Sequence, residues 1–399
     1  MSSNGSNTKN FFEEQKIKSK IKTTIVTEFY RIYLPIINRS VGKNASELIY
    51  LDLFSGPGCF NDGTESTPLA FMNILFNMRD RNLATKVNLV FNDENTDFVN
   101  TLKSCIMKHP FYNEMQIKPT ISNLKTNEFS LRPYLSKKVP IFSFIDPWGY
   151  KDITASLIWK LVKPIGSDCI LFFNSNRILQ DISKPTHNND MHEIFGDECD
   201  NAVNVQKNCL MSQNQKAEEL LKLFSKNLYN KVKIESNNYK LFVLPFTFMQ
   251  DECIKTSHQI VLLTKNHKAV REMKRVMLKQ SNNDAKDFIF DSKKIGMLSF
   301  FSREDDVRDN LGKLIICMLN DGSRLMYNVF TCEKLLEYID RYSMSKYFKV
   351  TPYTVEDVKK QIEIFDNDKL IDIFGVEGKK IRKRITLDRE FKFKSNILE

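Results

Sequence analysis

The chain alternates between short apolar runs and segments in which apolar residues recur every three or four positions. Runs that predict buried strands lie at residues 48–51, 86–94, 114–121, 139–150 and 167–174. Helical spacing follows the second run, at 96–109, and the fourth, at 154–163. This alternation predicts an α/β fold with a doubly wound, Rossmann-like, mainly parallel sheet, whose ligands sit at the carboxyl ends of the strands.

Two further runs end this predicted domain, which we place at residues 41–280. The runs at 239–250 and 257–266 are too close together for a helical crossover, so they predict an antiparallel pair that closes the sheet, with a helix at 268–280 behind it. Between strand 167–174 and this pair, residues 175–238 are more polar and less regular, with one predicted helix at 215–229. We interpret 175–238 as an insertion that covers the site.

The segments outside this domain have patterns of their own. Residues 1–40 combine a polar stretch at 1–10, expected to be disordered, with a helical pattern at 11–37. At the other end, a predicted domain at 300–395 contains helical patterns and then two alternating runs joined by a Gly-containing turn. The helices are predicted at 303–321, 332–343 and 354–370, and the hairpin at 371–387. Thr354 and Asp357 form a capping signal at the start of the third helix. Helices followed by a basic hairpin predict a winged helix-turn-helix.

The composition says more about the binding partners of the protein than about its fold. The 399 residues carry 59 Lys and Arg against 49 Asp and Glu, a net charge of +10, which favours nucleic acid as a partner. A Lys-rich and Asn-rich composition can also reflect nucleotide bias in the genome. No apolar stretch reaches membrane length and the start lacks a signal-peptide pattern, so we expect a cytoplasmic protein without membrane contact. The 8 cysteines show no C-x-x-C pair, so we expect reduced thiols, no disulfide framework and no metal site.

A glycine loop follows the first predicted strand in the stretch YLDLFSGPGCF, Tyr50 to Phe60. Gly56 and Gly58 let the backbone approach a ligand, and Asp52 completes the pattern D-x-x-x-G-x-G. Because Gly-Pro-Gly is also common in ordinary turns, a plain turn is the alternative. Asp93 ends the next strand, where its two carboxylate oxygens could accept both hydroxyls of a ribose; a solvated helix cap is the alternative there.

The stretch FSFIDPWGY, Phe142 to Tyr150, brings a third group to the same sheet edge. Asp146 is an acceptor, Pro147 leaves backbone carbonyls free, and Trp148 or Tyr150 offers a ring face for a flat substrate. Such a set could hold a planar amine in line with a methyl donor, without a histidine as base. The alternative is a strand-terminating turn with Trp148 packed in the core. We expect His258 and His267 to be structural.

In this order, YLDLFSGPGCF, FNDEN, FIDPWGY and HQIVLLTKNHKAVREMK resemble the three-Cys-motif partner proteins, a bacterial family similar to class I S-adenosylmethionine-dependent methyltransferases. The resemblance covers about residues 15–280. It implies a methyltransferase-like sheet, S-adenosylmethionine as cofactor, and a partner protein with a three-cysteine motif; the family often carries a winged-helix tail. Ser55 replaces the family's usual Ala and Trp148 its usual Phe. Ser66-Thr67-Pro68 stands where the family has Gly-Ser-Pro, so any contact that needs that glycine is in doubt.

The resemblance, together with the motifs, names the candidate residues. Cofactor binding is assigned to Asp52, Phe54, Ser55, Gly56, Pro57, Gly58, Asp93, Glu94 and Asn123. Catalysis is assigned to Asp146, Pro147, Trp148 and Tyr150. Contacts with DNA or RNA are assigned to the wing residues Lys379, Lys380, Arg382, Lys383 and Arg384, for which a solvated hairpin is the alternative.

The leading hypothesis is thus a methyltransferase that acts on an exocyclic amine of a nucleic acid base. A cytosine-C5 enzyme is disfavoured because no Pro-Cys nucleophile follows the fourth strand: Trp148 stands there. One alternative is a catalytically silent methyltransferase-like scaffold that binds nucleic acid or nucleotide and regulates a partner, for example in phage defence. Another alternative, methylation of a small molecule, leaves the basic tail unexplained.

Overall fold

The computed structural model of the chain divides into two compact units, Met1–Val276 and Met277–Glu399. The residues that it describes are 4–40, 47–59, 63–78, 86–150, 152–236, 240–249, 258–282, 287–291, 294, 307–321, 328–374 and 385–398.

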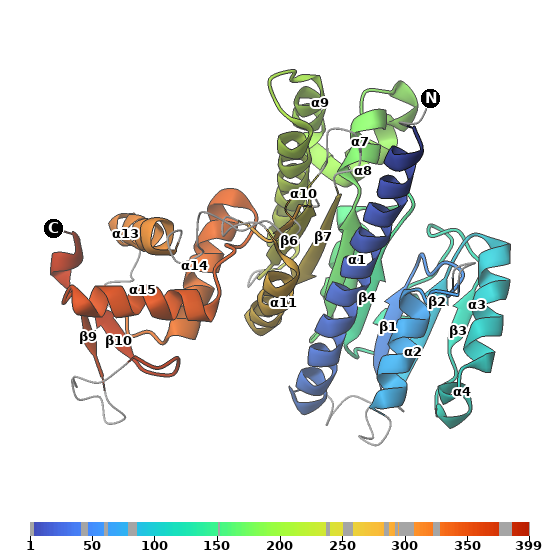
Figure 1. The fold of residues 1–399 in the computed structure, drawn as a ribbon, viewed down its shortest axis with the longest axis horizontal. Coiled ribbons are helices and arrows are strands. Elements are labelled where there is room, and N and C mark those ends of the chain that lie inside the picture. The colour runs from blue at the N-terminus through green and yellow to red at the C-terminus, as the bar shows by residue number, and fades with distance from the viewer. Residues whose placement is uncertain are drawn as a thin grey trace. The chain divides into compact units, whose positions relative to one another are not determined.

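The described residues form an eight-stranded sheet in the order β3-β2-β1-β4-β5-β7-β6-β8, of which β1 to β7 belong to the first unit (Figure 1). The strands are β1 (Leu48–Asp52), β2 (Val87–Asn92), β3 (Thr120–Ser122), β4 (Ile141–Ile145), β5 (Asp168–Phe173), β6 (Phe242–Phe248), β7 (His258–Thr264) and β8 (Ile289–Phe290). The pairs from β3 to β5 are parallel, whereas β7 is antiparallel to both β5 and β6. The doubly wound sheet and its antiparallel closing pair are therefore confirmed.

The register of the central strands aligns their carboxyl ends. Asp52, the last residue of β1, lies opposite Phe91 of β2 and opposite Phe144 of β4. Asp93 follows β2 directly and Asp146 follows β4 directly. The three acidic residues of the predicted motifs thus come from adjacent strands and end at one edge of the sheet.

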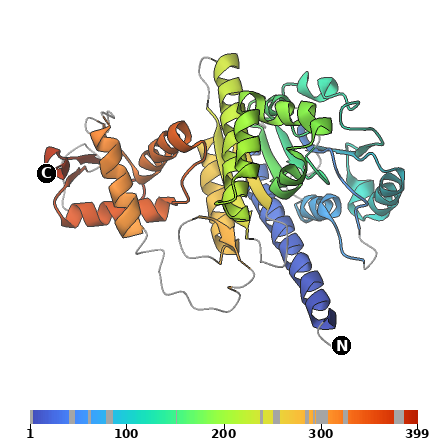
Figure 2. The same ribbon diagram turned by 90° about the horizontal axis from the view of Figure 1, so that it is seen from above.

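Helices cover both faces of the sheet, and Figure 2 shows α1 on one side of it and α10 on the other. The helices of this part are α1 (Asn4–Ser40), α2 (Thr67–Asn77), α3 (Thr96–Lys108), α4 (Phe111–Glu114), α5 (Arg132–Leu135), α6 (Ala155–Val162), α7 (Ser175–Asp181), α8 (Asn188–Phe195), α9 (Cys199–Lys207), α10 (Gln213–Glu235) and α11 (His267–Gln280). Short 3-10 turns, η3 (Pro185–His187) and η4 (Gly196–Glu198), precede α8 and α9.

An aromatic cluster fixes α1 to the sheet. Tyr30 of α1 lies 4.3 Å from Phe71 of α2 and 5.0 Å from Phe142 of β4, ring centroid to centroid. Tyr50 of β1 lies 4.0 Å from Phe71 in the same cluster. Each fully buried aromatic side chain contributes about 1.5–3 kcal/mol of transfer free energy, so α1 is part of the domain core.

Several predicted boundaries differ from the structure. Helix α1 begins at Asn4, so most of the start that was expected to be disordered is helical; once a helix is nucleated, each added residue gains a hydrogen bond. The third strand is Thr120–Ser122 instead of 114–121, because α4 occupies Phe111–Glu114 and Pro119 cannot donate to a ladder. The segment 175–238 is mainly helical, and its long helix α10 extends to Glu235 behind a Ser212–Gln215 capping box.

The second unit has its own core. A π-helical turn η6 (Val307–Leu311) leads into α13 (Gly312–Asn320), followed by α14 (Cys332–Tyr347), α15 (Val355–Asn367), β9 (Ile371–Ile373), β10 (Phe391–Phe393) and η8 (Ser395–Leu398). Buried residues from all three helices and both strands form one apolar cluster. The capping box of Thr354 and Asp357 at the start of α15 is confirmed.

The returning strand of the hairpin was predicted too early. Its residues are Phe391–Phe393, which pair antiparallel with β9, instead of the run that ends at 387. Residues 391–393 suit a strand because buried and less buried side chains alternate along them. Phe391 and Phe393 are buried, while Lys392 between them is half-buried. Phe330 adds an antiparallel bridge to Phe391.

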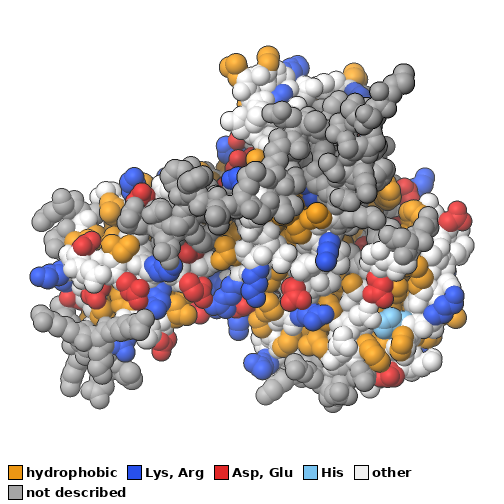
Figure 3. Space-filling model, viewed as in Figure 1, with side chains coloured by type: hydrophobic (Ala, Val, Ile, Leu, Met, Phe, Trp, Pro, Cys, Tyr) orange, Lys and Arg blue, Asp and Glu red, His pale blue; other side chains and the backbone are white. Residues whose placement is uncertain are grey.

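Charged side chains of both signs are interspersed on the face drawn in Figure 3. Among the described residues, no helix combines the length and the apolar character needed to cross a bilayer.

Candidate functional site

The glycine loop after β1 is held by backbone and side-chain hydrogen bonds. The Phe54 N–H donates to Asp52 Oδ1 at 3.0 Å. Both the N–H and the hydroxyl of Ser55 donate to the Asn92 carbonyl, at 3.0 and 3.1 Å. Gly56 and Gly58 have φ values of 64° and 81°, a backbone conformation that favours glycine. The loop therefore has one defined shape at the end of β1.

Asp93 joins the end of β2 to this loop. Its Oδ2 accepts the Gly56 N–H at 2.9 Å and its Oδ1 accepts the Asn95 N–H at 2.9 Å. The side chain that caps α3 is Asn95, which accepts from Asp97 and Phe98, so the helix-cap alternative for Asp93 does not hold. Because each carboxylate oxygen has two lone pairs, Asp93 keeps acceptor capacity for ligand hydroxyls.

Asn123 and Glu94 lie beside Asp93, and their contact with a cofactor stays a prediction. The Asn123 amide donates to the carbonyls of Asp93 and Glu94, at 2.9 and 3.0 Å, and its oxygen accepts from Thr96 at 2.8 Å. Asn123 thus braces the backbone around Asp93. The Glu94 side chain is exposed at the rim.

Asp146 forms an ion pair with Lys22 that the sequence did not predict. Lys22 Nζ of α1 lies 2.6 Å from Asp146 Oδ2, and both side chains are 21% exposed. The same ammonium lies 4.6 Å from the ring centroid of Phe172 on β5. An ion pair and a cation–π contact thus converge where β4 and β5 end. The only sequence signal is helical spacing, since Lys22 is three and seven residues before the buried Ile25 and Phe29.

The other residues of the DPWGY stretch separate into buried and exposed groups. Pro147 is buried, and Tyr150 is 3% exposed with its hydroxyl donating to Asp181 of α7 at 3.0 Å. Tyr150 is therefore a bracing residue and offers no ring face. Trp148 is 82% exposed, which contradicts the alternative in which it packs in the core. Trp148 is the aromatic surface of this stretch.

Burial changes the protonation of Asp52. Desolvation is the main cause that raises its pKa to about 8, and the negative charges of Asp146 and Asp93 act in the same direction. Hydrogen bonds from the Phe54 N–H and the Tyr50 hydroxyl act against this shift. The charges of Asp146 and Asp93 thus act on Asp52, whose own charge changes near neutral pH.

The loop geometry allows a test of whether a nucleotide-like methyl donor fits. A Cβ added at Gly56 would have no heavy atom within 4 Å, so the space beside this part of the loop is open. By contrast, a Cβ at Gly58 would lie 2.7 Å from Leu102 Cδ1, so Gly58 serves close packing against α3. Open space at Gly56, acceptor capacity on Asp93 and a buried acid at Asp52 suit a ligand with ribose hydroxyls and positive charge.

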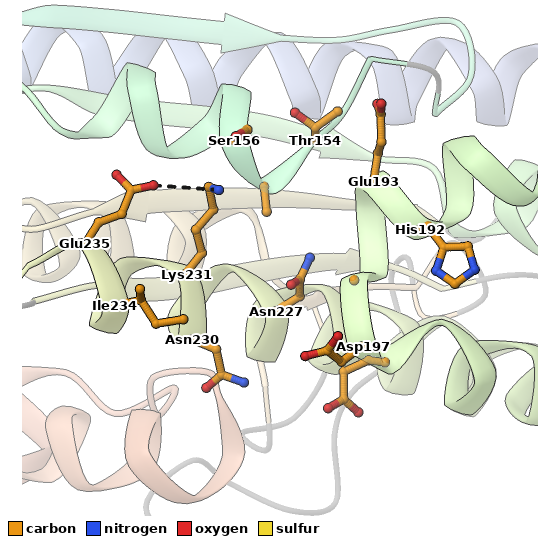
Figure 4. A pocket seen from close by; sticks show the side chains of 13 residues that line it. Thr154, Ser156, His192, Glu193, Asp197, Asn227, Asn230, Lys231, Ile234 and Glu235 are labelled. Carbon is orange, nitrogen blue, oxygen red and sulfur yellow. Dashed lines mark ion pairs between the residues drawn. The ribbon is translucent and has the colours of Figure 1, made fainter.

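A cavity of about 520 Å³ lies in the first unit (Figure 4). Its lining comes from the start of α6 and from α8, η4 and α10, and it includes the pair Lys231–Glu235, whose charged atoms are 3.6 Å apart. None of the predicted site residues lines it.

Comparisons with known proteins do not show a family for this chain. No family model and no curated protein matches it. A Legionella pneumophila protein of the family DUF519 aligns over 64% of this chain and 89% of its own, with 12% identity and a TM-score of 0.36.

Two of the similar solved structures are methyltransferases. The methyltransferase subunit of a type I restriction-modification system from Streptococcus thermophilus aligns over 61% of this chain and 43% of its own, with 11% identity and a TM-score of 0.28. The methyltransferase domain of bacterial CtHen1-C aligns over 60% of this chain and 100% of its own, with 11% identity and a TM-score of 0.28. Because these similarities are low, the functional interpretation rests on the sheet order and on the residues at the edge of the sheet. The three-Cys-motif partner family and its partner protein stay predictions.

The predicted wing residues cannot be placed in the same way. Lys379, Lys380, Arg382, Lys383 and Arg384 all fall within 375–384, outside the described residues. Their contacts with nucleic acid stay a prediction.

Proposed function

We propose that the first unit binds S-adenosylmethionine at the carboxyl ends of β1 and β2 and methylates an exocyclic amino group of a nucleic acid base beside β4. The observation that carries this proposal is the convergence of Asp52, Asp93 and Asp146 from three adjacent strands at one sheet edge. Open α/β sheets bind their ligands at such an edge.

Each residue has a distinct task in this proposal. Asp93 would accept the ribose hydroxyls, and the backbone around Gly56 would approach the methionine part of the cofactor. When bound, the cofactor supplies an electrophilic methyl group. Asp146 Oδ1 and the Pro147 carbonyl would accept the two N–H groups of the target amine, which orients the nitrogen lone pair and supplies rate through positioning.

Trp148 and Lys22 complete the substrate side. The exposed indole of Trp148 offers a face on which a base can stack, and stacking of this kind tolerates any base sequence. Among the described residues, Lys22 forms its ion pair with Oδ2 of Asp146, so Oδ1 is oriented while it keeps its acceptor capacity. Lys22 is a positioning residue in this scheme.

The second unit would supply affinity for the polyanion. Its described helices α13, α14 and α15, the bridge at Phe330 and the antiparallel pair β9–β10 support a winged helix-turn-helix as the fold that we propose for it. The five basic residues at 379–384 fall between β9 and β10 in the sequence. We assign to them sequence-independent contacts with phosphates.

A catalytically silent scaffold is the second candidate function, and one observation favours it. The Lys22 ammonium already lies on Asp146, and the Gly56 N–H already lies on Asp93, so the site is internally paired. A protein of this kind would bind nucleic acid and regulate a partner without transferring a methyl group.

Calorimetric titration with S-adenosylmethionine and S-adenosylhomocysteine tests the proposal, with Asp93→Ala as the variant and Asp200→Ala, at an exposed acidic residue of α9, as the control. We expect micromolar binding that Asp93→Ala abolishes and Asp200→Ala keeps. If the folded protein binds neither compound, the scaffold becomes the better account.

Asp146→Ala then separates the two functions. Loss of methyl transfer to DNA or RNA with retained nucleic-acid binding supports the enzyme. Cofactor binding without any transfer by the unsubstituted protein supports the scaffold.

A further inference from the structure

Two cysteines from distant parts of the first unit have their sulfur atoms in close contact. Cys59 follows Gly58 at the end of the glycine loop, and Cys105 lies on α3, 46 residues further along the chain. Their Sγ atoms are 2.9 Å apart, and both residues are half-buried. A disulfide bond is about 2.05 Å long, so a shift of about 1 Å would bring the sulfurs to bonding distance.

The backbone around this pair already holds the two segments together. Gly58 is buried against α3, where an added Cβ would lie 2.7 Å from Leu102 Cδ1 and 3.8 Å from Cys105 Cβ. The Ser66 N–H donates to the Gly58 carbonyl at 2.8 Å, and Cys59 forms an antiparallel bridge with Glu65. A bond between the sulfurs would therefore need little movement of the main chain.

We propose that Cys59 and Cys105 form an oxidation site, at which a peroxide converts the two thiols into a disulfide that fastens the glycine loop to α3. The step is a two-electron oxidation. The O–O bond of hydrogen peroxide breaks, one S–S bond forms, and the two thiol protons leave in two water molecules.

The surroundings of Cys105 set the speed of this reaction. Burial, and then the hydrogen bond and charge of Cys59, raise the pKa of Cys105 to about 11, so Cys105 is a neutral thiol near pH 7. The thiolate is the reactive form of cysteine. We therefore expect the disulfide to form faster at pH 9 than at pH 7.

Fastening the loop has a consequence that rests on the proposed cofactor site. The same loop carries Gly56, whose N–H donates to Asp93 at 2.9 Å. Because the segments are already in contact, the disulfide should hold this arrangement without distorting it. The oxidised protein should bind S-adenosylhomocysteine within threefold of the reduced protein and unfold at a higher temperature.

The site is tested by peptide mapping after treatment with hydrogen peroxide. The thiols that are exposed among the described residues are removed first, as Cys209→Ser and Cys317→Ser, to limit links between molecules. After oxidation the remaining thiols are blocked with iodoacetamide, and the digest is searched for a peptide linked through Cys59 and Cys105. We expect this peptide, and at least a tenfold loss of it when Cys105→Ser is added.

The proposal is overturned if Cys59 and Cys105 both remain alkylated at a peroxide dose that oxidises Cys209 in the Cys317→Ser protein. It is equally overturned if Cys59 links to a different cysteine.

Two measurements on the oxidised protein separate this proposal from the proposed function. The thermal midpoint should rise by about 5–10 °C, because the crosslink restricts the unfolded chain, and an unchanged or lower midpoint would contradict fastening. A tenfold loss of S-adenosylhomocysteine affinity on oxidation would show distortion and would also contradict it. If neither form binds the compound, the cofactor proposal fails while the mapped disulfide and the midpoint still decide the oxidation site.

Discussion

Lys22 Nζ of α1 lies 2.6 Å from Asp146 Oδ2, although the two residues are 124 positions apart in the chain. The aromatic cluster of Tyr30, Phe71 and Phe142 holds α1 in place about two turns further along. A helix that precedes the sheet thus contributes a side chain to the residue on which the proposed chemistry depends.

The first prediction concerns this pair. Lys22→Met should lower kcat for methyl transfer by at least about tenfold, or 1.4 kcal/mol, because Asp146 loses the contact that orients it. Cofactor affinity should stay within threefold, and Lys22→Arg should restore most of the activity. The measurement is transfer of tritiated methyl groups to a mixture of DNA and RNA, with the exposed Lys20→Met as control. Unchanged kcat and KM in Lys22→Met would remove Lys22 from the site.

The raised pKa of Asp52 predicts a pH dependence of cofactor binding. Its pKa is raised from 3.8 to about 8, so Asp52 is mostly neutral at pH 6 and mostly ionised above pH 8. A positively charged ligand favours the ionised form, so binding should release a proton and tighten as pH rises from 6 to 8.

The variant Asp52→Asn isolates this effect, because titration of the ligand's own groups is common to both proteins. Titration calorimetry at several pH values should give a ratio of wild-type to variant affinity that increases up to about pH 8 and is then flat. A ratio that does not change with pH would show that Asp52 does not sense the ligand's charge.

Gly58 and Gly63 allow a matched test of loop packing. Both have a φ of 81°, but a Cβ at Gly58 would lie 2.7 Å from Leu102 Cδ1, whereas a Cβ at Gly63 would meet nothing within 4 Å. Gly58→Ala should therefore lower the free energy of unfolding by about 1–3 kcal/mol more than Gly63→Ala, the usual range for overpacking. Urea unfolding measures both. Equal losses would mean that the loop yields at Gly58 and that the contact with α3 does not restrain it.

The elements that the sequence predicted best are those with local signals. Strand β1 ends at Asp52 and strand β2 at Asn92, close to the predicted limits, because runs such as 48–51 are buried and apolar. The closing pair β6–β7 followed from the short connection between two apolar runs. In each case neighbouring residues in the sequence carried the information.

The remaining features of the site depend on contacts that no local pattern contains. Lys22 reaches Asp146 from a helix over 100 residues earlier, and Cys59 meets Cys105 only because Gly58 packs on α3. Tyr150 and Trp148 could not be told apart by type, since both are aromatic, and the partner Asp181 on α7 decides which one is buried. Tertiary packing sets these relationships.

Trp148 provides a test of the substrate side. Because its side chain is 82% exposed, Trp148→Ala should change stability by no more than about 0.5 kcal/mol. Affinity for single-stranded DNA or RNA should fall by about 1–3 kcal/mol through lost stacking, while Trp148→Phe should keep most of it. Fluorescence anisotropy of a labelled oligonucleotide measures both variants. Leu210→Ala, at a residue that is 94% exposed, is the control, and an equal effect in Trp148→Ala and Leu210→Ala would exclude stacking.

The basic segment between β9 and β10 predicts the salt dependence of nucleic-acid binding. Each phosphate neutralised on duplex DNA contributes about −0.9 to the slope of log K against log salt, so changing all five basic residues to Gln should flatten this slope by up to about 4.5. These residues are Lys379, Lys380, Arg382, Lys383 and Arg384.

A charge-matched control separates a local contact from the effect of net charge. It changes five exposed lysines of the first unit to Gln: Lys103, Lys108, Lys138, Lys160 and Lys207. Binding is followed by anisotropy between 50 and 300 mM salt. If both sets flatten the slope equally, net charge and not the wing accounts for the affinity. If neither does, the segment 379–384 makes no phosphate contacts, and the second unit needs a partner other than nucleic acid.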